Sequence, residues 1–320
     1  MWDPYEDENP SDMSDEDADA YGDASCIQLR RLTSLVDVRL SFVALSAAEL
    51  AGATQITRLM LQGCALLPRA QPNATAPAGI SALLSTVAGF EQLQHLELLE
   101  LDLKGHEALP LQRFAALTAS PELTYLEVSG EEGFGPLPDG AVQHMFPKDR
   151  TLKLRQLLLL PSKGTRGQEW PLDDMSCCVT GAELRGIASS CPELQQLCIA
   201  GAVHPGDISG LLQLPASCTE LSLGGPAMSD AVLPVVRQLT QLRDLSWYYS
   251  AGLTDVGVEQ LTALTRLCGL DVRHCSGLSD ELGGNPQYGS DLQVYSGDDD
   301  EVGGKISASV VGCQSQPASC

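Results

Sequence analysis

The sequence predicts an α/β solenoid, in which the chain winds into stacked coils and each coil contributes one strand to a parallel sheet. Three observations predict this fold class. An apolar phrase returns four times over residues 191–280, the phrase alternates between faces as a strand does, and residue types that start helices follow it. We expect a curved horseshoe of about nine coils, with parallel strands on its concave face and helices and loops on its convex face.

The returning phrase is an apolar residue, two variable residues, Leu, one variable residue and another large apolar residue. Its first positions lie 24, 24 and 25 residues apart. The second and third apolar positions are separated by one residue, so both side chains point to the same face of a strand. The four copies are Leu194, Leu197 and Ile199; Cys218, Leu221 and Leu223; Leu242, Leu245 and Trp247; and Leu267, Leu270 and Val272.

A single strand of this kind cannot bury its apolar face alone. Stacking the next coil about 4.8 Å away completes the hydrogen-bond ladder and the core together. The pairs Ser-Asp at 229–230 and Thr-Asp at 254–255 are helix-capping residue types before apolar runs, so a helical segment should follow these strands. Thr180 and Glu183 form a capping-box pattern, which predicts a helix over 181–190.

Five looser copies of the phrase precede residue 191. The third fits nearly as well in a register slipped to begin at Leu98. A helical pattern over 80–87 follows the second copy, and the Gly- and Pro-rich stretches 129–150 and 161–178 flank the fifth copy and should form loops on one face. The five copies are Leu32, Leu35, Val38 and Leu40; Ile56, Leu59, Leu61 and Cys64; Leu93, Leu96 and Leu98; Leu123, Leu126 and Val128; and Leu154, Leu157 and Leu159.

Three segments carry a resemblance to a known family: CPEL at 191–194, GLTD at 252–255 and CSGLSD at 275–280. They resemble the cysteine-containing class of leucine-rich repeats, whose pattern C-x-x-L-x-x-L-x-L-x-x-C is followed by L-[TS]-D. That class is known mainly from F-box/leucine-rich-repeat proteins, so the resemblance implies repeats that bind the substrate of a cullin-type ubiquitin ligase. We expect no F-box in this chain, because the first copy of the phrase follows the acidic start almost at once.

We expect one leucine-rich-repeat domain over 26–295, between a disordered acidic tail over 1–25 and a flexible tail over 296–320. The net charge is −23 over 320 residues, and the first 25 residues hold ten acidic and no basic side chains. Leu292 and Val294 suggest a degenerate last strand, which is expected where a stack must hide its end.

The acidic balance disfavours nucleic-acid binding, which needs a basic footprint. No apolar run approaches the roughly 18 residues of a membrane span and no signal-peptide pattern opens the chain, so we expect a cytoplasmic protein without membrane contact, with the nucleus and the axoneme as alternatives. The eleven cysteines form no short disulfide framework. Those that we interpret as reduced thiols are Cys64, Cys191, Cys198, Cys218, Cys268 and Cys275.

The motif search indicates no enzyme. The chain has no phosphate-binding glycine loop and no G-x-S-x-G elbow, and His106 lacks a second His one helical turn later. The cysteines and the histidine over 177–204 match no zinc-ligand spacing. We therefore expect a non-catalytic protein with no cofactor and no metal.

Strand alternation leaves a second set of side chains pointing away from the core on the concave face. Their mixed charge, with exposed Tyr and Met, is typical of a protein-binding face rather than a small-ligand pocket. A solvated sheet, with binding on loops or helices, is the alternative, and Tyr248 is the first candidate for a contact. The candidate partner-binding residues are Arg39, Met60, His95, Glu97, Tyr125, Glu127, Leu158, Tyr248 and Arg273.

The sequence thus favours a scaffold for protein–protein interaction. The resemblance implies ubiquitin ligase subunits among its partners. The alternative is a structural subunit of a cytoskeletal or axonemal assembly, which co-sedimentation with microtubules would favour.

Overall fold

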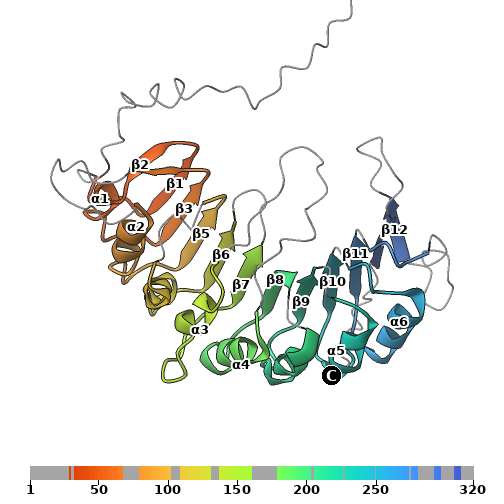
Figure 1. Cartoon of the computed structure of the whole chain (residues 1–320). Coiled ribbons are helices and arrows are strands. Elements are labelled where there is room, and N and C mark those ends of the chain that lie inside the picture. Colours follow the sequence, from red (N-terminus) through yellow and green to blue (C-terminus); the bar gives the residue numbers. More distant parts are fainter. Residues whose placement is uncertain are drawn as a thin grey trace, which may run out of the picture.

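The chain folds around one large sheet, seen in a computed structural model that describes residues 29, 32–67, 79–101, 109–130, 137–160, 179–202, 205–225, 228–248, 250–273, 275–279, 292–296 and 306–310. Nine strands of this sheet run parallel, which makes the fold α/β (Figure 1). They are β1 (Asp37–Ser41), β3 (Arg58–Gln62), β5 (His95–Leu99), β6 (Tyr125–Ser129), β7 (Gln156–Leu160), β8 (Gln196–Ala202), β9 (Glu220–Gly224), β10 (Asp244–Tyr248) and β11 (Gly269–Arg273).

The nine strands lie side by side in the order in which they occur along the chain. Helical segments connect most of them and lie along one side of the row, whereas β2 (Ala44–Ser46) and β4 (Ala65–Leu67) form a small parallel sheet of their own (Figure 1). The helical segments are α1 (Ala47–Leu50), α2 (Gly79–Val87), η3 (Leu111–Thr118), α3 (Ala141–Met145), α4 (Gly181–Ser190), η5 (Pro205–Gln213), η6 (Asp230–Val232), α5 (Leu233–Val236), α6 (Asp255–Glu259) and η7 (Gln260–Ala263), where η marks a 3₁₀-helix.

The apolar phrase sets the register between the strands. Each strand places its second and third phrase positions directly beside those of its neighbours, so two apolar rows run the length of the parallel sheet. The third copy has Leu96 and Leu98 in these rows, so the slipped register is wrong. The rows are Val38, Leu59, Leu96, Leu126, Leu157, Leu197, Leu221, Leu245 and Leu270, and Leu40, Leu61, Leu98, Val128, Leu159, Ile199, Leu223, Trp247 and Val272.

These rows form the core with the helical segments. All eighteen residues are buried except Leu40, which is partly buried against the same cluster. Trp247, the largest of them, is fully buried as predicted. The phrase therefore marks the residues that hold the sheet to its helices, at roughly 1.5 to 3 kcal/mol for each buried side chain before chain entropy is subtracted.

The predicted helix starts are confirmed. Thr180 Oγ1 accepts a hydrogen bond from Glu183 N at 3.3 Å and Glu183 Oε2 accepts one from Thr180 N at 2.8 Å, which completes the capping box of α4. Ser229 and Thr254 cap η6 and α6. The helical pattern over 80–87 corresponds to α2.

Five of the six described cysteines are free, namely Cys64, Cys191, Cys198, Cys218 and Cys275. All five are buried, in agreement with the interpretation as reduced thiols. Cys268 is disulfide-bonded, so this interpretation is wrong for that residue. The next residue, Gly269, begins β11, the last of the parallel strands.

Beyond β11 the sheet continues with antiparallel strands. β13 (Ile306–Val310) pairs antiparallel with β11, and β12 (Leu292–Ser296) pairs antiparallel with β13. The expected last strand at Leu292 and Val294 is thus β12, although it does not join as a further parallel strand. β13 falls in the range expected as a flexible tail, whereas the acidic tail over 1–25 and the insertion over 161–178 lie outside the described residues.

Candidate functional site

The candidate site is the face of the parallel sheet opposite the two apolar rows, which we call the open face. Strand alternation builds it from two further rows in register, one residue away from the core rows. The rows are Asp37, Arg58, His95, Tyr125, Gln156, Gln196, Glu220, Asp244 and Gly269, and Arg39, Met60, Glu97, Glu127, Leu158, Cys198, Ser222, Ser246 and Asp271.

The β1 end of the open face carries a mixed-charge group. Arg39 Nε lies 3.2 Å from Asp37 Oδ1, and Arg58 Nη1 lies 3.9 Å from Asp37 Oδ2. All three side chains are more than two-fifths exposed, so these ion pairs contribute little to stability. They remain available for other partners.

An aromatic and acidic group lies on β5 and β6. The His95 and Tyr125 rings stack with centroids 4.0 Å apart and planes 5° apart. His95 Nε2 contacts Glu97 Oε1, and the Tyr125 hydroxyl donates to Glu127 Oε2. Burial, then the hydrogen bond to Glu127 and the acidic charges nearby, raise the pKa of Tyr125 well above its ordinary value. Tyr125 is therefore a neutral hydrogen-bond donor at physiological pH.

The centre of the open face, on β7 and β8, is uncharged. Gln156 Nε2 donates to Gln196 Oε1 at 2.9 Å, and Leu158 lies beside Cys198 in register. Burial raises the pKa of the Cys198 thiol to about 11. Since thiolates are the reactive form, Cys198 is an apolar surface here rather than a nucleophile.

A second acidic group lies on β9 to β11. Glu220 and Asp244 are in register, and burial together with the charge of Asp244 raises the pKa of Glu220. The Tyr248 hydroxyl donates to Asp271 Oδ2 at 3.5 Å. Across β5 to β10 the strand residues include no Lys or Arg. This stretch of the open face is therefore acidic, whereas the predicted contact residues as a set had mixed charge.

The structure brings together only part of the predicted set of contact residues. His95, Glu97, Tyr125 and Glu127 form one contact group, with Met60 beside Glu97 in register. Tyr248 lies four strands from Tyr125 and four residues further along its strand, so the two tyrosines do not belong to one contact group. Arg39 belongs to the β1 group and Leu158 to the uncharged centre, while Arg273 extends β11 beside Tyr248.

Cys198 is a member of the open face that the predicted set of contact residues did not include. It was grouped with the buried thiols of the repeat, and it is indeed 6% exposed. The signal that could have placed it correctly is the alternation itself, because Cys198 lies between Leu197 and Ile199. Its neighbours Leu158 and Ser222 occupy the same row.

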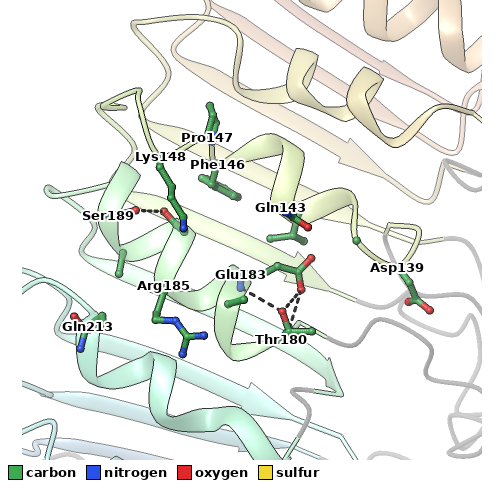
Figure 2. Close-up of a pocket in the computed structure, with 15 residues that line it drawn as sticks. Asp139, Gln143, Phe146, Pro147, Lys148, Thr180, Glu183, Arg185, Ser189 and Gln213 are labelled. Carbon is green, nitrogen blue, oxygen red and sulfur yellow. Dashed lines mark hydrogen bonds between the residues drawn. The ribbon is translucent and has the colours of Figure 1, made fainter.

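A groove on the helical side was not predicted. It has a volume of about 1000 Å³ and is lined by residues of α3, α4 and their flanking turns, among them Phe146, and by Gln213 at the end of η5 (Figure 2). Its charged lining residues are Asp139, Lys148, Glu183 and Arg185, but Glu183 is turned back onto Thr180 in the capping box (Figure 2). The one buried carboxylate of the groove, on Glu183, is therefore already hydrogen-bonded within the capping box.

No model of a known protein family matches this chain, and no curated protein is similar to it. Within the described ranges, no group of three or more His, Cys, Asp or Glu residues is placed to hold a metal ion. Three residues whose spacing was compared with zinc sites above lie outside the described residues, namely Cys177, Cys178 and His204. Among the helices that the structure describes, none is both long enough and apolar enough to cross a membrane.

Proposed function

We propose that this chain is a leucine-rich-repeat solenoid of the cysteine-containing class and acts as a non-catalytic scaffold that binds a protein on its open face. The fold part of this proposal is supported by nine strands whose spatial order equals their sequence order, with the apolar phrase in register throughout. Such stacking is how repeats that cannot bury their apolar faces alone become stable.

One observation carries the binding part of the proposal: the acidic, basic-free stretch of the open face from β5 to β10. Its acidic residues on β5–β6 and on β9–β10 flank the uncharged centre with Leu158 and Cys198. The partner that complements this pattern is a protein segment with basic side chains on either side of an apolar residue. The stacked His95 and Tyr125 rings add a flat surface of the kind enriched at binding hot spots.

The experiment is affinity purification of the intact protein from its own cells. The test variant is Glu97→Lys/Glu127→Lys, and the control is Glu259→Lys, which reverses an exposed charge on α6. Proteins that the wild type and the control retain should be recovered about tenfold less with the test variant, and wild-type binding should weaken as salt screens the charges. A set of bound proteins unchanged by Glu97→Lys/Glu127→Lys would refute binding at this face.

The identity of the bound proteins tests the cellular role. Cullin and adaptor subunits that depend on Glu97 and Glu127 would support a role in ubiquitin ligation, as the resemblance implies. Tubulin, with co-sedimentation on microtubules, would support the structural alternative.

A further inference from the structure

The first strand of the sheet has a free edge among the described residues. β1 is the outermost strand and pairs with β3 on one side only. An edge strand presents unpaired N–H and C=O groups, to which another strand can add. Proteins usually block such edges with Pro, a bulge or charged side chains, and the β1 sequence DVRLS has no Pro and no Lys, only the opposite charges Asp37 and Arg39.

Exposed apolar side chains lie directly before and directly after β1, although the ring of Phe42 packs toward Gly63 on the β3 side. Leu32, Val36 and Phe42 are 49%, 50% and 71% exposed. They are three of the five large apolar residues that are exposed in the described part of the chain. Phe42, directly after β1, also has a φ of 54°, a conformation that non-glycine residues rarely adopt. An apolar rim beside an unpaired strand is typical of a surface that is covered in the functional state.

The residues of this edge complement themselves. Val36-Asp37-Val38-Arg39-Leu40 is apolar at its centre and at both ends, with an acidic residue on one side of Val38 and a basic residue on the other. If a second copy pairs antiparallel about Val38, each Asp37 lies opposite an Arg39 of the other copy, and each Val36 lies opposite a Leu40. Directly opposed side chains on antiparallel strands have Cβ atoms about 4.5–5.5 Å apart, close enough for ion pairs and apolar contact.

We propose that two copies of this chain associate through their β1 edges, as antiparallel strands related by a two-fold axis at Val38. The interface is isologous, since the same patch serves on both copies. The ion pairs that Asp37 makes with Arg39 and Arg58 within one chain do not prevent this association, because they are exposed and weak. The two open faces then lie on the same side of one continuous sheet, since Asp37 and Arg39 belong to the open face in both copies.

The test is a charge exchange measured by sedimentation equilibrium on the full chain. The wild type should reach twice the 34.0 kDa of one chain. Asp37→Arg places two arginines opposite two arginines, and Arg39→Asp places two acids opposite two acids, so each variant alone should be monomeric. An equimolar mixture of the two should form a heterodimer, and the double variant Asp37→Arg/Arg39→Asp should dimerise with itself.

Matched controls lie far from β1. Glu259→Arg and Arg266→Asp change exposed charges on the helical side near the other end of the sheet and should remain dimeric. Circular dichroism of each variant confirms folding, and rescue in the mixture independently excludes misfolding as the cause of dissociation. A monomeric wild type, dimeric single variants or failure of the mixture to associate would each overturn the proposal. None of these results bears on binding at Glu97 and Glu127, so the two proposals are tested separately.

Discussion

The two faces of the parallel sheet differ in how much their residues vary from strand to strand. On the helix-covered face every strand repeats the same choice, a large apolar residue at each of two positions. On the open face the same strands vary from Arg and Asp to Leu, Tyr and Gln. A stable fold therefore requires repeated apolar residues on the helix-covered face only, because the open face does not pack against the helices. The varied face is free to carry specificity.

The largest effect should come from placing the same charge on each face of one strand. Leu221→Asp buries an unpaired carboxylate between Leu197 and Leu245 and should destabilise the fold by about 4 kcal/mol or more. Ser222→Asp, one residue later on the open face, should cost less than about 1 kcal/mol. Urea unfolding followed by circular dichroism measures both. Equal losses would show that the two faces do not differ as described.

A second test uses the thiols of the helix-covered side. Burial raises the pKa of Cys191 and Cys218 from the ordinary 9.0 to about 12. The folded chain therefore keeps both protonated where the unfolded chain ionises them. The stability that depends on these thiols should be intact below about pH 9 and fall between pH 9 and 12, by roughly 1.4 kcal/mol per pH unit for each thiol.

Urea unfolding under reducing conditions at pH 8 and at pH 10.5 measures this decline. The variant Cys191→Ala/Cys218→Ala loses packing at both pH values, but its stability should fall less steeply between them. A decline as steep as in the wild type would mean that other groups cause the alkaline loss.

The smallest effect should come from the helix starts, where one side chain links two neighbouring segments. Asp230 accepts hydrogen bonds from Thr254 N at 2.9 Å and from Thr254 Oγ1 at 2.6 Å. Asp230→Ala should therefore cost about 1–3 kcal/mol. The control Asp255→Ala removes one exposed bond, from Ser279 N at 3.0 Å, and should cost less than about 1 kcal/mol. Thermal unfolding compares the two, and an equal loss would contradict the linking role of Asp230.

Much of the parallel sheet could be predicted because its signal is local and repeated. All nine copies of the phrase became neighbouring strands, including the loose ones before residue 191. The third copy remained ambiguous because Leu98 and Leu101 continue the apolar run. Only pairing with Leu61 and Val128 decides which of its leucines face inward.

The sequence could predict most of the residues that lie on the open face, but not which of them contact one another. Alternation places Glu97, Tyr125 and Glu127 on the open face, yet nothing local indicates that His95 stacks on Tyr125 from another strand, 30 residues away. Cys198 was interpreted as a buried reduced thiol, which is confirmed, but it was not predicted to belong to the open face. The disulfide of Cys268 and the antiparallel strands after β11 depend on contacts distant in sequence, and the phrase carries no information on them.

By itself, the sequence determined the α/β class, the inward residues of every parallel strand except β5, and the caps of α4, η6 and α6. These properties follow from the spacing of residues within a few positions, which strand and helix geometry translates directly into faces and ends. The tertiary structure alone decided which open-face side chains meet, where the sheet stops running parallel and which strand edge has no partner among the described residues. Those outcomes depend on the register and order of whole strands, which arise only when every segment is packed against its neighbours.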